Sequence, residues 1–220
     1  MRIGKLALAL CAAALAAVAM TSCGSAKKSL HVYNWGDYID PALVKQFEKE
    51  FNCNVKMDFF DSNESMYAKI KAGGGGYDVI VPSSYFADIM YQQKMIRALD
   101  HAKLPNISNV DPDYLKKAVD KKMEYCVPYL ISFTGIGYNK DKVKDFKPSW
   151  HMFEDSSLKG RCVILNDPRE GLGAALRTLG YSLNTTKQEE IDKAVKQLVE
   201  WKKNIAKFDV DEAKRGIASG

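Results

Sequence analysis

The chain has 220 residues, of which 46% are hydrophobic and 27% are charged, and its formal net charge at pH 7 is +5. These proportions are those of a globular protein and exclude a chain that is disordered throughout. The positive excess is small and forms no basic block, so it gives no indication of nucleic-acid binding.

The first 22 residues have the pattern of an export signal. Arg2 and Lys5 form a positive start, and residues 6–20 are an apolar run without a charge. A membrane-spanning helix needs roughly 20 apolar residues, so we expect a cleaved signal peptide over residues 1–22. Residues 20–23 (MTSC) fit a bacterial lipobox, although leucine is more usual than Met20. We expect a lipid on Cys23 and a tether over residues 23–29; the alternative is an ordinary signal peptide.

After the tether, strand-like and helix-like segments alternate as in a parallel α/β unit. The helix-like segments are amphipathic, and the first of them opens with Pro41, which is tolerated in the first turn of a helix. The expected strands are residues 30–34, 54–60 and 77–81, and the expected helices are residues 41–51, 65–71 and 85–92.

A second α/β unit is expected to begin near Thr134. Further strands are expected at residues 125–133, 135–139 and 161–165, and helices at 171–179 and 187–208. We therefore predict a first lobe over residues 30–133 and a second lobe over residues 134–220. The second lobe has too few strands to close its sheet, so we expect this sequence to be the N-terminal part of a longer protein.

Three cysteines remain beyond Cys23. Cys53, Cys126 and Cys162 have neither zinc-site spacing nor a redox CxxC spacing, so no metal is expected. Each lies in an apolar context, which favours buried thiols. A disulfide between two of them is the alternative in an oxidising compartment.

Polar and aromatic residues follow three of the predicted strands of the first lobe. Ligands of parallel α/β sheets bind at the carboxyl ends of the strands, so these loops are candidate binding loops. They are residues 34–38 (NWGDY), 61–64 (DSNE) and 82–85 (PSSY).

A fourth candidate loop, residues 166–170 (NDPRE), follows a strand of the second lobe. Asp167 and Glu170 are three residues apart at a helix start, where this spacing places them on one face. Capping of the helix is the alternative role of these acids.

Aromatic faces and carboxylates together suit a flexible alkyl chain that carries several ammonium groups. An aromatic face contributes about 0.5–2 kcal/mol per well-placed cation. A buried ammonium without a partner is prohibitive, so carboxylates must meet it. The candidate residues of both kinds are Trp35, Tyr38, Tyr85, Asp37, Asp167 and Glu170.

The chain also resembles the periplasmic spermidine/putrescine-binding proteins of ABC importers, from about residue 30 to residue 220. The resemblance runs through residues 32–39 (VYNWGDYI), 62–69 (SNESMYAK), 77–85 (YDVIVPSSY), 104–106 (LPN), 127–129 (VPY), 135–139 (GIGYN) and 166–170 (NDPRE). It implies an α/β fold of the two-lobed periplasmic binding protein type, a venus-flytrap of type II topology, with the second lobe incomplete in this chain.

The resemblance implies a solute-binding lipoprotein that captures polyamines and delivers them to the permease subunits of an ABC importer. Such a protein is neither an enzyme nor a user of a cofactor, and it acts as a monomer. It is expected in the periplasmic space on its lipid anchor, or on the outer face of a cell that has no outer membrane.

The resemblance also assigns roles to residues of the candidate loops. It implies that Trp35 and Tyr38 stack on the ligand, that Asp37 lies beside them, that Ser83 and Tyr85 line the first lobe, and that Asp167 and Glu170 hold ammonium groups from the second lobe. The family's remaining aromatic and acidic ligand residues are expected beyond Gly220.

This sequence departs from the family at Gly36, where a small hydroxyl residue is usual. The markers of ligand preference are mixed. Tyr85, Asp167 and Glu170 resemble the spermidine-preferring branch, whereas Asp37 and residues 60–64 resemble the putrescine branch. The balance slightly favours spermidine.

Three alternatives compete with this interpretation. A glycosidase using Asp167 and Glu170 needs carboxyl groups facing each other about 5–9.5 Å apart, which one helical turn does not provide. The second alternative is a flytrap protein that binds another solute. Ferric sites of this architecture favour two tyrosines in the second lobe, where Tyr181 stands alone. Anion sites favour arginine, which the first-lobe loops lack. The third alternative is a signalling lipoprotein that presents bound polyamine to a sensor, and the sequence does not decide against it.

Overall fold

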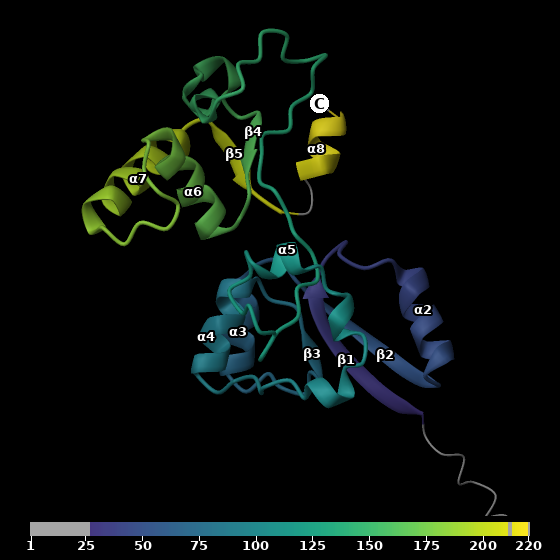
Figure 1. Ribbon diagram of the computed structural model, residues 1–220. Coiled ribbons are helices and arrows are strands. Elements are labelled where there is room, and N and C mark those ends of the chain that lie inside the picture. Colours follow the sequence, from purple (N-terminus) through teal and green to yellow (C-terminus); the bar gives the residue numbers. More distant parts are fainter. Residues whose placement is uncertain (1–26, 211–212, 220) are drawn as a thin grey trace, which may run out of the picture.

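The structure is a computed structural model that describes residues 27–210 and 213–219. These residues form two α/β units, one above the other, joined by extended chain (Figure 1). The predicted α/β class is therefore confirmed, while the boundary at residues 133 and 134 stays a prediction. The expected signal peptide and Cys23 lie outside the described residues. Within the described ranges, none of the helices has the length and apolar character that a membrane span requires.

The first lobe is built on a parallel three-stranded sheet with the strand order β2-β1-β3. The strands are β1 (Lys28–Trp35), β2 (Cys53–Phe60) and β3 (Val79–Ile80). Parallel strands need a crossover connection. Helix α2 (Pro41–Glu50) connects β1 to β2, and α3 (Asn63–Lys71) connects β2 to β3, which pairs with the other side of β1. In the register of β1 and β2, Trp35 lies opposite Phe60. The loops that follow both strands therefore lie at one edge of the sheet.

Helices α2 and α3 of the first lobe begin after residues whose side chains cap them. Asp40 accepts a hydrogen bond from the backbone N–H of Ala42, and Ser62 accepts one from Ser65, as preferred N-cap residues do. The lobe continues with α4 (Ser84–Gln92), the short helices η1 (His101–Lys103) and η2 (Ile107–Asn109), and α5 (Pro112–Leu115). Because Asp40 and Ser62 lie only a few residues after β1 and β2, the polar loop residues stay at the carboxyl edge of the sheet.

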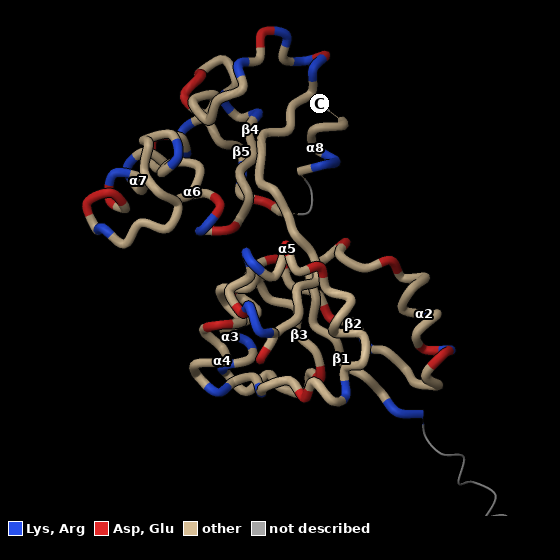
Figure 2. The backbone as a smooth tube through the Cα atoms, viewed as in Figure 1, with Lys and Arg blue, Asp and Glu red and all other residues tan. Residues whose placement is uncertain are grey.

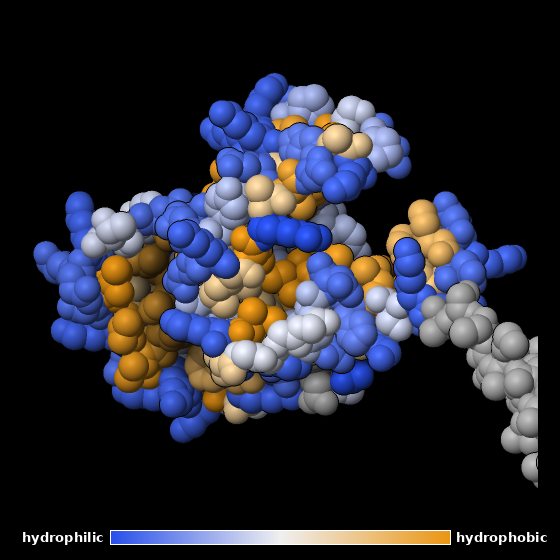
Figure 3. All heavy atoms as spheres, turned by 90° about the horizontal axis from the view of Figure 1, so that it is seen from below, coloured by the Kyte–Doolittle hydropathy of each residue, from blue (hydrophilic) through white to orange (hydrophobic). Residues whose placement is uncertain are grey.

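The core of the first lobe lies between the sheet and helices α3 and α4. It contains Tyr33, Phe60, Met66, Phe86 and Met90. Helix α2, in contrast, has no buried residue, and apolar side chains on it are exposed. In the view from below, apolar surface is visible between polar side chains (Figure 3).

The second lobe contains a parallel pair of strands, β4 (Cys162–Ile164) and β5 (Ile205–Phe208). They are connected through α6 (Pro168–Thr178) and α7 (Gln188–Trp201). The remaining elements are η3 (Trp150–Glu154), η4 (Ser156–Leu158) and α8 (Ala213–Ser219). Trp201 is fully buried in the core of this lobe, where its ring contacts Phe153.

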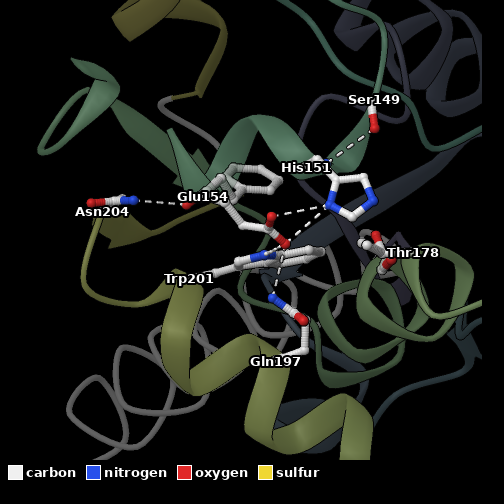
Figure 4. Close-up of polar contacts among 9 residues, drawn as sticks. Ser149, His151, Glu154, Thr178, Gln197, Trp201 and Asn204 are labelled. Carbon is white, nitrogen blue, oxygen red and sulfur yellow. Dashed lines mark hydrogen bonds and ion pairs between the residues drawn. The ribbon is translucent and has the colours of Figure 1, made fainter. Parts of the chain in front are cut away.

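A polar cluster around Glu154 ties η3 to α7 (Figure 4). Glu154 Oε1 accepts hydrogen bonds from Trp201 Nε1 at 3.3 Å and from Gln197 Nε2 at 3.1 Å, and it lies 3.1 Å from His151 Nδ1. A buried indole N–H needs an acceptor. Glu154 supplies it while its own carboxylate stays partly exposed to water.

Three predicted elements are wrong, namely the strands at residues 125–133 and 135–139 and the end of the helix at residues 187–208. Residues 125–139 contain no strand, because this segment passes between the lobes without a neighbouring strand of the described chain to pair with; Phe133 within it is 95% exposed. The helix predicted over residues 187–208 ends at Trp201, and residues 205–208 instead form β5, which pairs with β4.

The three cysteines of the described chain are free thiols. The prediction of buried thiols is confirmed for Cys53 and Cys162, whereas Cys126 is only partly buried. Burial raises the pKa of Cys126 to about 11. The disulfide alternative is not realised in this structure.

Candidate ligand-binding site

Aromatic side chains gather where β1 ends. Trp35 is the last residue of β1, and its ring centroid lies 4.5 Å from that of Phe60 and 5.9 Å from that of Tyr38. Trp35 is partly buried against the first-lobe core, and Tyr38 is 37% exposed. The two rings therefore offer apolar and π surface beside the edge of the sheet, and their predicted contact with a ligand stays a prediction.

The segment between the lobes holds this aromatic loop in place. Tyr129 Oη donates a hydrogen bond of 2.5 Å to the backbone carbonyl of Tyr38. The sequence did not single out Tyr129 as a site residue. Its only signal was a place in the motif VPY, because a hydrogen bond across 91 residues is not visible in local patterns.

Asp37 is placed differently from the other candidates. Its backbone φ is 57°, a left-handed conformation that aspartate tolerates better than most residues. Its side chain is 79% exposed, and Oδ2 lies 3.6 Å from Lys214 Nζ of α8. The predicted contact of Asp37 with a ligand stays a prediction.

The side chain of Asn63 connects the loops that follow β2 and β3. Asn63 is fully buried, and Nδ2 donates to Ser83 Oγ at 3.1 Å and to Tyr85 Oη at 3.2 Å. Asn63 Oδ1 accepts from the backbone N–H of Ser83 at 2.9 Å. Sequence reasoning identified the loop of Asn63 but not its role, which is to orient Ser83 and Tyr85.

Tyr85 stays protonated at physiological pH. Burial raises its pKa to about 12, and the negative charges of Asp167 and Glu64 add to the rise. The hydrogen bond from Asn63 and the charge of Arg169 act in the opposite direction. Asp167 belongs to the second lobe, so the two lobes meet electrostatically at the Tyr85 hydroxyl.

Asp167 has the capping role that the sequence left open. Its Oδ1 accepts the backbone N–H of Arg169 at 2.8 Å and that of Glu170 at 3.1 Å, at the start of α6. Both bonds end on the same oxygen, so the cap does not use Oδ2. Glu170 lies in the same first turn and is partly buried. Capping and ligand binding are therefore compatible in Asp167.

The two lobes also touch directly at this site. The guanidinium carbon of Arg169 lies 5.1 Å from the centroid of the Tyr85 ring. Charged residues lie on the facing ends of both lobes (Figure 2). Neither Arg169 nor Glu64 was a predicted site residue, although both lie in the predicted loops.

A surface pocket of about 360 Å³ lies beside these loops. It is lined by Tyr33, Gly36, Phe59, Phe60, Asp61 and Ser65. Only Gly36 and Asp61 belong to the candidate loops, so the pocket adjoins the aromatic site without containing its carboxylates. The structure thus groups Trp35 with Tyr38, and Ser83 with Tyr85 and Asp167.

Known proteins match this chain over most of its length. The family model for bacterial extracellular solute-binding proteins matches residues 42–215. The spermidine/putrescine-binding periplasmic protein of Escherichia coli K12 is 42% identical over 185 residues, which cover 83% of this chain and 53% of that protein. The putrescine-binding periplasmic protein PotF of the same organism is 36% identical over 225 residues, or 96% of this chain and 61% of that protein.

A solved structure agrees with these matches. The TpPotD lipoprotein of Treponema pallidum aligns with a TM-score of 0.80 at 37% identity, covering 87% of this chain and 61% of that one. The chain thus spans about half to three fifths of the length of these relatives. Its two-lobed α/β fold is that of the periplasmic binding proteins, and the chain belongs to the bacterial extracellular solute-binding protein family.

Proposed function

We propose that this chain belongs to the solute-binding component of an ABC importer and that its ligand is a polyamine such as spermidine or putrescine. The observation that carries the proposal is the meeting of aromatic faces and carboxylates from two lobes: Tyr85 of the first lobe lies within electrostatic reach of Asp167 of the second. Relatives named for spermidine and putrescine binding support it.

In this proposal the protein captures its ligand without covalent chemistry. The methylene groups of the polyamine pack on Trp35 and Tyr38, where apolar contact and cation–π attraction act together. Asp167 Oδ2 and Glu170 accept hydrogen bonds from the ammonium groups, which are stronger than neutral ones because both partners are charged. Closure of the lobes then follows because the ligand binds the closed form more tightly.

Location and partners complete the proposal. The sequence of residues 1–23 supports export and a lipid on Cys23, which would hold the protein at a membrane surface in the periplasm or outside the cell. The closed, loaded protein would dock on the permease subunits of the importer as a monomer. The anchor would restrict its search for the permease to that surface.

Isothermal titration calorimetry tests the ligand assignment. The mature full-length protein without residues 1–23 is titrated with spermidine and then with putrescine, and saturable binding at micromolar or lower concentration is expected. The variant Tyr38→Leu should weaken binding, whereas Tyr114→Leu, at a comparably exposed tyrosine of α5, should not. If neither polyamine binds, the ligand assignment is wrong, while membership of the family is unaffected. The order of the two affinities decides the preference.

A further inference from the structure

A cation of the second lobe rests on an aromatic ring of the first. Arg169, in the first turn of α6, places its guanidinium carbon 5.1 Å from the centroid of the Tyr85 ring in α4. Guanidinium groups are planar and stack on aromatic faces, which an ammonium group cannot do in the same way. The contact joins the lobes at the site where the ligand is proposed to bind.

Arg169 is held by its own lobe at its backbone and at its guanidinium group. Its backbone N–H donates a hydrogen bond of 2.8 Å to Asp167 Oδ1. Its guanidinium Nη2 donates a hydrogen bond of 2.7 Å to Asn184 Oδ1, in the loop between α6 and α7. The guanidinium is therefore presented to Tyr85 by the second lobe as a preorganised group.

The ring that receives the guanidinium is also fixed. Tyr85 packs on Phe86 with ring centroids 5.1 Å apart, and its hydroxyl accepts a hydrogen bond from buried Asn63. The positive charge of Arg169 lowers the pKa of Tyr85 against the larger effect of burial, so its field reaches the hydroxyl. A rigid donor of positive charge thus meets a rigid π face.

We propose that Arg169 is a positioning residue that latches the second lobe onto the Tyr85 ring and thereby slows the escape of bound ligand. The proposal rests on the proposed function for its binding readout. Arg169 does not take an ammonium itself; it occupies one face of Tyr85 and leaves Asp167 and Glu170, on the same helical turn, to the ligand. A second contact between the lobes, Lys214 with Asp37, joins two side chains that are about 80% exposed, and an ion pair of this kind contributes little.

The first test compares two arginines of one helix. Arg169→Gln and Arg177→Gln remove the same charge from α6, but Arg177 lies in its last turn. In the mature full-length protein, Arg169→Gln should weaken spermidine binding about 2- to 5-fold, the range of a cation–π contact made by an exposed cation. The loss should lie mainly in faster dissociation, measured by stopped flow. An unchanged or tighter affinity in Arg169→Gln overturns the latch, as does an equal loss in Arg177→Gln.

The second test asks whether Arg169 acts through the Tyr85 ring. In a Tyr85→Phe background the ring is retained, so Arg169→Gln should still weaken binding by a similar factor. In a Tyr85→Leu background the ring is absent, so Arg169→Gln should have little further effect. If Arg169→Gln weakens binding as much in the Tyr85→Leu background as in the wild type, the two losses are additive and the proposal is overturned. This holds even if each single variant binds weakly.

A third measurement needs no ligand. Small-angle X-ray scattering of the ligand-free protein should show a larger radius of gyration for Arg169→Gln than for wild type and Arg177→Gln, because the lobes separate more often. Equal radii overturn the latch. If the wild type binds no polyamine, the ligand assignment fails on its own, while the scattering result still decides whether Arg169 holds the lobes.

Discussion

Asn63 provides the sharpest test of how the binding loops are held. Its side chain makes three hydrogen bonds, to Ser83 Oγ, Tyr85 Oη and the backbone N–H of Ser83. The substitution Asn63→Leu keeps a similar volume at this fully buried position and removes every polar atom of the side chain. Packing therefore changes little, and the hydrogen bonds are lost together.

The expected loss in the free energy of unfolding depends on whether each group that was hydrogen-bonded to Asn63 finds another partner in the variant. Ser83 and Tyr85 are partly buried residues, so we expect their hydroxyls to turn to water or to each other. The backbone N–H of Ser83 cannot turn, and an unsatisfied buried donor costs about 1–3 kcal/mol. We expect Asn63→Leu to lower the free energy of unfolding by this amount and to weaken polyamine binding, because the candidate binding residues lose their common support.

Urea denaturation of the mature protein measures the change in the free energy of unfolding. Asn54→Leu is the matched control because Asn54 is exposed on β2, and exposed substitutions usually change stability by less than about 0.5 kcal/mol. If Asn63→Leu is no less stable than Asn54→Leu, Asn63 does not support the loops through its hydrogen bonds, and the geometry of Ser83 and Tyr85 must have another cause.

Three further predictions concern the second lobe and pH. Asp167→Asn keeps a good helix cap but removes a charge, so calorimetry should show polyamine binding weaker by about 1.5–3 kcal/mol; unchanged affinity would refute its ligand role. Glu154→Ala leaves the buried N–H of Trp201 without its acceptor, so urea denaturation should show a loss of about 1–3 kcal/mol, and wild-type stability would contradict this. Because the folded-state pKa of Tyr85 is raised from 10.0 to about 12, the folded protein keeps a proton that the unfolded chain loses, so stability should fall as pH rises from 10 to 12. The same fall in Tyr85→Phe would exclude Tyr85 as its source.

Sequence patterns correctly predicted the helices and strands that are determined by residues close together in the chain. Helix α2 begins at Pro41 after the cap Asp40, as expected, and β2 runs over the predicted alternating segment with one additional residue, Cys53. Helix α6 begins at Pro168, three residues before the predicted start at Gly171, because Asp167 caps it. Caps and amphipathic periods act within a few residues, so a sequence displays them directly.

The errors concern segments whose structure depends on a distant partner. Residues 125–139 have strand-like composition but no neighbouring strand in the described chain, so they stay without a ladder. Residues 205–208 continue an amphipathic pattern, yet they form β5 because β4 lies alongside them. A strand is defined by its pairing, which composition alone does not specify.

The α/β class, the candidate binding loops and the family resemblance can be predicted from the sequence, because they depend on residue types in order along the chain. Which of the candidate residues meet became visible only in the folded chain. Folding buried Asn63 between Ser83 and Tyr85, turned Asp37 toward Lys214, and stacked Arg169 on Tyr85 across the lobes. The physical reason is that hydrogen bonds and cation–π contacts depend on distances of a few ångströms between groups, which chain folding sets and sequence separation does not.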